Sequence, residues 1–264
     1  MARQVGAVLA ALTWAGWAGA GEPVADDEVM HWRVSTGVNF TSGDYGQDAD
    51  TDILYVPITV RADYEPFLLK LTVPYIRIDG PGGVVGGTEG PVIVDDETAG
   101  TETNSGLGDI VLAGTYIHYP EGGSPWPVVE LTGKVKFPTA DEDQDLGTGE
   151  FDYTVQLDVS KGIGRVLAFT TFGYRILGDP SDFNLNNVFF ASLGGGFRIM
   201  KGVQLGLVYD FREASTSGVS DSHELVPYFS WRFAERYLLS GYAVAGLSNA
   251  AADWGSGISI GVDF

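Results

Sequence analysis

The sequence predicts an all-β protein, a transmembrane antiparallel β-barrel, and three observations lead to this prediction. Apolar and polar residues alternate in many segments, each long enough to cross a bilayer as a tilted strand of about 9–11 residues. The number of these segments is even, and the connections between them are alternately long and short. A barrel in lipid requires such alternation in every strand, because the outer face meets lipid and the inner face lines a polar lumen.

The alternation is clearest between Pro127 and Lys161. The apolar residues from Val129 to Phe137 alternate with a polar set: Glu130, Thr132, Lys134 and Lys136. After an acidic break, the apolar residues from Phe151 to Val159 alternate with a second polar set: Asp152, Thr154, Gln156, Asp158 and Ser160. Each half is therefore predicted to be a strand with one apolar and one polar face.

About twelve strands are predicted, and they span approximately 31–42, 50–62, 64–78, 106–119, 127–138, 150–160, 165–177, 187–199, 203–212, 224–233, 237–248 and 254–264. The longest connection, 79–104, is expected to hold a small hairpin around Val92-Ile93-Val94. Connections are long or acidic after every odd strand and short after every even one. Because outer-membrane barrels have short periplasmic turns and longer outer loops, both termini are expected in the periplasm. A soluble sandwich has similar hairpins but does not predict this alternation.

The N-terminus predicts export. Arg3 precedes an apolar run from Val5 to Trp17, and Ala18-Gly19-Ala20 fits a cleavage site for signal peptidase. The run is short for a membrane-anchoring helix, which needs about 20 apolar residues. We therefore expect a cleaved signal peptide, residues 1–20, followed by an outer-membrane barrel, residues 21–264, located in the bacterial cell outer membrane.

Composition excludes several classes of function. The chain has no cysteine, so disulfides, thiol catalysis and thiolate metal sites are absent. It has 15 Lys and Arg against 35 Asp and Glu, a net charge of −20, which argues against binding nucleic acid because phosphate contacts need basic groups.

Aromatic residues are expected at both membrane interfaces, as two girdles. Residues at the inner ends of the predicted strands are Tyr116, Tyr119, Trp126, Trp231, Phe233 and Phe264. Residues at the outer ends are Phe151, Tyr153, Phe172, Tyr174, Phe189, Tyr209 and Phe211. The last strand resembles the outer-membrane assembly signal, with Phe264 as its final aromatic, and this resemblance implies insertion by the barrel-assembly machinery. Expected partners also include outer-membrane lipid and lipopolysaccharide.

Four short motifs resemble a family of outer-membrane proteins linked to the meta-pathway of phenol degradation. They are Ser105-Gly106-Leu107-Gly108-Asp109, Gly133-Lys134-Val135-Lys136-Phe137-Pro138-Thr139, Leu146-Gly147-Thr148-Gly149 and Gly173-Tyr174. Ala140 stands where the family more often has glycine. The resemblance implies a barrel and uptake of small aromatic or apolar compounds, without identifying the solute.

The predicted lumen is the first candidate site. Side chains assigned to it by the alternation are Arg33, Arg61, Lys70, Asp109, Glu130, Lys134, Lys136, Asp152, Asp158, Arg175, Arg198, Asp210, Arg212, Arg232 and Glu224. Eight strands leave an interior filled by side chains and 16–18 leave an open channel, so twelve should leave a narrow passage. Two interpretations stay open: a constriction that selects small solutes by charge and size, or ion pairs that hold the barrel shut.

Two further candidate sites are weaker. Asp141, Asp143 and Asp145 have the spacing of calcium ligands, but Leu146 stands where that loop needs glycine, so a solvated acidic loop is the favoured interpretation. A hydrolase would need a nucleophile beside a base, and His31, His118 and His223 have no evident serine partner. We therefore predict a passive transporter or narrow channel without a cofactor. The alternative is a closed barrel whose acidic loops bind cations, lipopolysaccharide or a partner.

Overall fold

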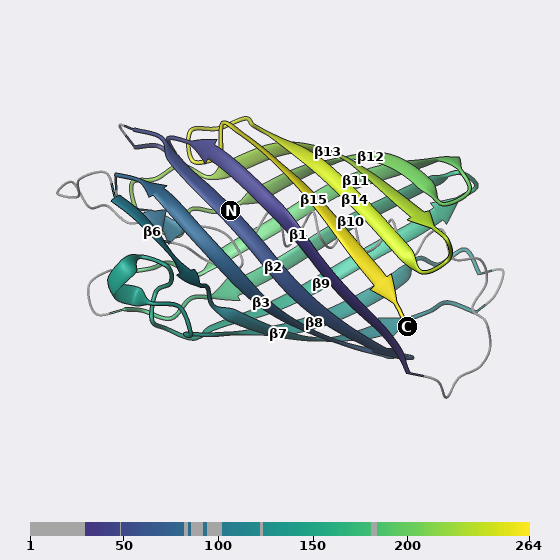
Figure 1. Ribbon diagram of the computed structural model, residues 1–264. Coiled ribbons are helices and arrows are strands. Elements are labelled where there is room, and N and C mark those ends of the chain that lie inside the picture. The colour runs from purple at the N-terminus through teal and green to yellow at the C-terminus, as the bar shows by residue number, and fades with distance from the viewer. Residues whose placement is uncertain are drawn as a thin grey trace.

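The computed structural model describes residues 30–47, 49–81, 84–85, 92–93, 102–121, 124–180 and 184–264. Thirteen strands form one antiparallel sheet, which closes on itself because β2 pairs with β3 as well as with β1 (Figure 1). The strands of the barrel are β1 (His31–Gly43), β2 (Thr51–Tyr64), β3 (Phe67–Gly80), β6 (Glu102–Leu107), β7 (Ile110–His118), β8 (Val128–Phe137), β9 (Asp152–Ile163), β10 (Val166–Ile176), β11 (Val188–Met200), β12 (Val203–Arg212), β13 (Ser222–Phe233), β14 (Tyr237–Gly246) and β15 (Trp254–Asp263).

β6 and β7 are two parts of one crossing of the barrel wall. Both pair with β3, β6 through Tyr75–Gly80 and β7 through Phe67–Thr72. The two parts are separated by Gly108 and Asp109, and the Gly108 N–H donates to the Pro74 carbonyl across the break, at 2.9 Å. The barrel therefore has twelve crossings, as predicted. The predicted fourth strand, 106–119, begins four residues too late and lacks the interruption at Gly108 and Asp109. Alternation of apolar and polar residues does not show where the hydrogen bonds between two strands are interrupted.

Alternating burial separates the two faces of the wall. In β9, for example, Asp152, Thr154, Gln156 and Asp158 are buried, whereas Tyr153, Val155 and Leu157 are exposed. The exposed residues belong to an apolar outer surface that a soluble protein would have to cover. Aromatic pairs lie on it near both ends, including Trp231 with Phe233 and Phe189 with Phe211. The transmembrane barrel is thus confirmed.

The connections at the two ends differ in length. At one end, which we call the turn end, they are 65–66, 119–127, 164–165, 201–202 and 234–236. At the other, which we call the loop end, they are 44–50, 81–101, 138–151, 177–187, 213–221 and 247–253. The first and last strands meet at the turn end, where the Trp32 N–H donates to the Phe264 carbonyl at 3.4 Å. The end of the chain is visible there in Figure 1.

The expected hairpin is present within the longest connection. β4 (Val84–Val85) pairs with β5 (Val92–Ile93). Val84 packs with buried residues of the lumen, and Val92 packs with Leu177, Leu185 and Val188. The hairpin is therefore packed onto the loop end of the barrel. The predicted signal peptide, residues 1–20, lies outside the described residues.

Within the described part of the chain, no helix has the length and apolar character needed to cross a membrane.

Candidate functional site

The lumen consists of two halves with different contents. The turn-end half contains a cavity of about 310 Å³, which we call the turn-end cavity. The loop-end half is filled by buried apolar side chains, which we call the loop-end cluster. Leu167 belongs to both, and Gln204, which lines the cavity, donates a hydrogen bond to the Tyr228 hydroxyl of the cluster at 3.0 Å. These residues mark the boundary between the halves.

The turn-end cavity is lined by more basic than acidic groups. Its basic residues are Arg61, Lys70, Lys134, Lys161, Arg165 and Arg198, and its acidic residues are Glu130 and Asp158. Asp158 accepts hydrogen bonds from Gln156, at 2.7 and 2.9 Å, and from the Thr171 hydroxyl, at 2.6 Å. Apolar residues complete the wall: Leu68, Ala113, Ile117, Trp126, Val128, Val166 and Leu167. The cavity can therefore receive a small molecule that has both an anionic and an apolar part.

The loop-end cluster combines side chains of the wall with side chains of the loops. The wall contributes Ile53, Tyr55, Ile76, Ile78, Leu167, Phe169, Val208, Val226, Tyr228, Tyr242 and Val244. The loops contribute Tyr45, Val84, Leu146, Ala250 and Ala252. Burial raises the pKa of the Tyr45 hydroxyl well above its usual range, so this group remains neutral.

Glycines let two aromatic rings of the cluster lie against the wall. A Cβ added at Gly194 would lie 2.3 Å from Phe169 Cζ, and one at Gly206 would lie 2.3 Å from Tyr228 Cζ. Any side chain at these two positions would displace the rings. Glycines on the inner face of β11 and β12 therefore let the lumen be filled by rings from neighbouring strands.

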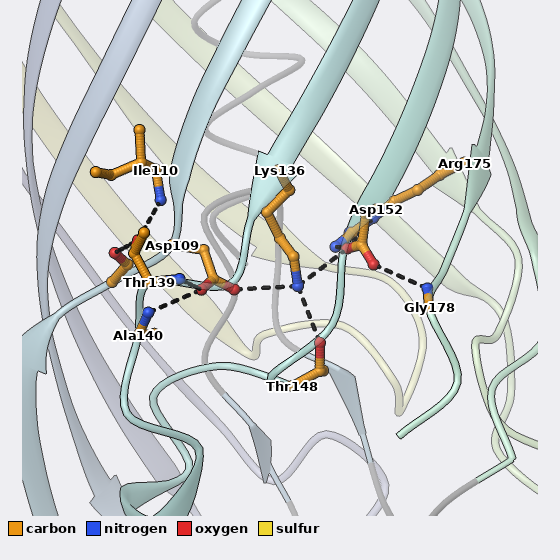
Figure 2. Close-up of polar contacts among 10 residues, drawn as sticks. Asp109, Ile110, Lys136, Thr139, Ala140, Thr148, Asp152, Arg175 and Gly178 are labelled. Carbon is orange, nitrogen blue, oxygen red and sulfur yellow. Dashed lines mark hydrogen bonds and ion pairs between the residues drawn. The ribbon is translucent and has the colours of Figure 1, made fainter. Parts of the chain in front are cut away.

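A chain of four buried charges, which we call the Lys136 network, lies at the loop end (Figure 2). Lys136 Nζ lies 3.0 Å from Asp109 Oδ2 and 3.3 Å from Asp152 Oδ2, and Arg175 Nε donates to Asp152 Oδ2 at 3.0 Å. No side chain of the four exposes more than 2% of its surface. Paired in this way, the charges satisfy one another and leave little capacity for a solute.

The Lys136 network also attaches the 138–151 loop to the wall. Asp109 Oδ1 accepts from the backbone N–H groups of Thr139 and Ala140, at 3.1 and 3.0 Å. Lys136 Nζ donates to the Thr148 hydroxyl at 2.9 Å. Both ends of the loop are thus bonded to charged side chains that point into the lumen, as Figure 2 shows.

The family of the chain follows from a comparison of sequences. The profile of the family described as "Putative MetA-pathway of phenol degradation" matches residues 54–264. The chain belongs to this family. Among curated proteins, no sequence matches it.

Two solved structures are similar to the phenol-degradation family member described here. The crystal structure of an outer membrane channel from Pseudomonas putida F1 has a TM-score of 0.64 and 15% identity, over 93% of this chain and all (100%) of that one. The KdgM porin has a TM-score of 0.52 and 8% identity, over 88% of this chain and 99% of that one. At 15% and 8% sequence identity, the similarity to these two structures shows a common fold and nothing further. Because a closed barrel with an apolar outer face is stable only in lipid, the protein is placed in the bacterial outer membrane.

Three of the four motifs that resemble the phenol-degradation family meet at or beside the Lys136 network. Asp109 ends the first motif, Lys136 lies in the second, and Leu146 and Thr148 lie in the third. The Gly147 backbone approaches Asp109 closely, since a Cβ there would lie 2.9 Å from Asp109 Oδ2. These three motifs therefore have a structural explanation in this chain: they fix the 138–151 loop to the wall.

The residues predicted to line the lumen are distributed over four groups. Arg61, Lys70, Glu130, Lys134, Asp158 and Arg198 line the turn-end cavity. Asp109, Lys136, Asp152 and Arg175 form the Lys136 network. Asp210 and Glu224 are cross-strand partners with buried side chains, and Arg212 follows two residues later on the same strand. Arg33 and Arg232 bind Asp263 at the turn end, each with a contact of 2.5 Å.

Several functional candidates were not predicted. Arg165 and Trp126 line the cavity from turns, where side-chain alternation does not predict which side chains face the lumen, and Lys161 lines it from the end of β9. Asp263 lies on the inner face of β15. Its position in the strand, an even number of residues from Gly255 and Gly261, could have predicted that it faces the lumen. Leu146 is 1% exposed, and nothing in its acidic surroundings indicates burial.

The sequence favours a solvated acidic loop over a calcium site at Asp141, Asp143 and Asp145, and Asp141 and Asp145 lie at the two ends of a short helix. Asp141 caps the 3₁₀-helix η1 (Glu142–Gln144) by accepting from the Asp143 N–H at 3.1 Å. Across the described ranges, no three His, Asp or Glu side chains are grouped closely enough to hold a metal. Of the histidines considered for catalysis, His118 is exposed on the outer face, and His223 Nδ1 lies 2.7 Å from the Tyr209 hydroxyl.

Proposed function

We propose that the protein is a narrow passive channel for small anionic solutes that carry an apolar part. The observation behind this proposal is the turn-end cavity, which combines six basic and two acidic side chains with an apolar wall. The protein as a whole has the opposite sign, with a net charge of −20. A concave site with an excess of positive charge raises the local concentration of anions, so the cavity favours anions.

In this proposal the turn end faces the periplasm, because short turns of outer-membrane barrels lie on that side. The basic residues of the lumen, and not an enzymatic reaction, provide the activity. The barrel is embedded in outer-membrane lipid, contacts lipopolysaccharide at its loop end, and is inserted by the barrel-assembly machinery. Phe264, which is 67% exposed at the end of the last strand, fits the role of assembly signal.

Measurements with the pure protein in planar bilayers test the preference for anions. Under a KCl gradient, the reversal potential of the wild type should have the sign of chloride selectivity. Reversal of two cavity charges, Lys134→Glu with Arg198→Glu, should move it towards zero or to the cation side. A wild type that prefers potassium would contradict the proposal.

Liposome swelling, measured relative to protein-free liposomes, tests the charge of the proposed solute with three aromatic compounds of similar size: benzoate, benzyl alcohol and benzylamine. We expect benzoate to enter fastest and benzylamine slowest, since only their charge differs substantially. Equal swelling rates for the three compounds would contradict the proposed selection of solutes by charge.

The loop-end cluster favours a second candidate function, a closed barrel that binds a partner through its loops. Beside the cluster, the loop end holds a cavity of only about 20 Å³, the space of about one water molecule. Absence of conductance and of swelling with all three compounds would favour this alternative.

A further inference from the structure

We propose that the 138–151 loop is the outer gate of the channel and that Lys136 is the positioning residue that holds it closed. This inference rests on the proposed channel function. The closed position is the one described above, in which Leu146 fills part of the loop-end lumen and Lys136 is covered by the loop.

Three contacts fix the loop, and each reaches the inner face of the wall. Asp109 binds the backbone of Thr139 and Ala140 where the loop begins. Lys136 binds the Thr148 hydroxyl near its end. Between these two attachments Leu146 lies against Gly106 of β6, where an added Cβ would be 2.9 Å from Leu146 Cδ1. The loop is therefore held at both ends and inserted at its middle.

The contact between Lys136 and Thr148 can break without breaking the wall. Lys136 stays between Asp109 and Asp152 whether or not the loop is bound, because both carboxylates belong to the barrel wall. The bond to Thr148 is a single hydrogen bond to a neutral hydroxyl. Asp109, by contrast, binds two backbone N–H groups where the loop begins, so the segment from Leu146 to Thr148 is the part that can swing outwards.

Opening would have two consequences for a solute. Leu146 would leave the lumen, and the Lys136 ammonium, whose side chain is 2% exposed here, would be uncovered. Lys134, two residues earlier on the same face of β8, already lines the turn-end cavity. The open gate would thus extend the basic lining of the cavity towards the loop end, which suits an anion.

Single-channel recording of two Thr148 variants tests the role of this bond. Thr148→Val keeps the shape of the side chain and removes the hydroxyl, whereas Thr148→Ser keeps the hydroxyl. We expect Thr148→Val to increase the open fraction at least about tenfold, the factor expected from one hydrogen bond to a charged group. Thr148→Ser should remain close to the wild type. An equal open fraction in all three proteins would overturn the role of Lys136.

A reversible crosslink tests the gate itself, and the absence of cysteine from the chain makes it specific. In the variant Gly106→Cys with Leu146→Cys, the two new side chains point toward one another, because a Cβ at position 106 would lie 2.9 Å from Leu146 Cδ1. Oxidation should therefore join the loop to β6. We expect the oxidised protein to remain closed and a reductant to restore conductance. Unchanged conductance after confirmed crosslinking would overturn the gate and leave the channel proposal intact.

Labelling of intact cells separates the gate from the channel. In Leu146→Cys, a membrane-impermeant maleimide should react slowly, and addition of Thr148→Val should accelerate the reaction at least about tenfold. Rapid labelling without any conductance would contradict the channel proposal, and the loop would then be no gate. Equal labelling rates with normal conductance would contradict the gate alone.

Discussion

Lys134 and Lys136 lie two residues apart on the same face of β8, yet their surroundings differ completely. Lys134 lines the turn-end cavity. Lys136 is buried between Asp109 and Asp152 and is covered by the 138–151 loop. Both have the same parity in the strand, so the difference comes from what lies above them in the lumen. In the turn-end half, charged side chains line a cavity, and in the loop-end half, they are buried against one another.

The first prediction tests this contrast with one substitution at both positions. Lys136→Met should lower the free energy of unfolding by about 3–5 kcal/mol, because it removes a buried basic partner from both Asp109 and Asp152. Lys134→Met should cost less than about 1 kcal/mol, since its ammonium lines a cavity. Urea unfolding in lipid vesicles measures both. Equal losses would mean that the two halves do not differ in this way.

The second prediction concerns the two faces of the wall. Leu157 is exposed on the outer face, and Leu157→Arg should cost about 2–4 kcal/mol if it lies near the middle of the bilayer. The neighbouring Gln156 lines the turn-end cavity beside Asp158, so Gln156→Arg can form an ion pair there and should be much milder. The same unfolding experiment compares them, and a larger loss for Gln156→Arg would reverse the assignment of the faces.

The strands could be predicted from the sequence because lipid imposes one rule on all of them. Each outward side chain must be apolar, so the alternation in segments such as Phe151 to Val159 marks both the strand and its faces. Once the strands are marked in this way, their number and the lengths of the connections between them can be counted in the sequence. The break at Gly108–Asp109 did not, since it depends on a loop that binds Asp109 from elsewhere in the chain.

The contents of the lumen could be predicted only in part. Parity identifies Lys134 and Lys136 as inward-facing, but it does not distinguish a cavity from a buried ion pair. That distinction depends on how the loops fold, and residues such as Leu146 and Tyr45 lie in polar, glycine-containing segments without periodicity. Turn residues that line the cavity, among them Trp126, lack a parity rule altogether.

The third prediction examines an ion pair at the turn end. Asp263 binds Arg33 and Arg232, and its side chain is 28% exposed, in contrast to the fully buried Lys136 network. Asp263→Asn should therefore cost about 1–2 kcal/mol, less than Lys136→Met. The cost should shrink in concentrated salt, whereas the cost of Lys136→Met should change little. Unfolding at low and high ionic strength measures how each substitution's cost depends on salt. The same salt dependence for Asp263→Asn and Lys136→Met would contradict the prediction.

The smallest effect is expected at the mouth of the turn-end cavity, where it should appear in transport and not in stability. Trp126 is 73% exposed and also lines the cavity, so Trp126→Ala should change the free energy of unfolding by less than about 0.5 kcal/mol. A ring at this position can contact an aromatic anion as it leaves, and such a contact contributes about 0.5–1.5 kcal/mol. Benzoate permeation should therefore fall about two- to tenfold while chloride conductance is unchanged. Trp126→Phe, which keeps an aromatic ring, should retain most of the benzoate flux. If benzoate and chloride decrease together, Trp126 shapes the opening of the cavity and makes no selective contact with the solute.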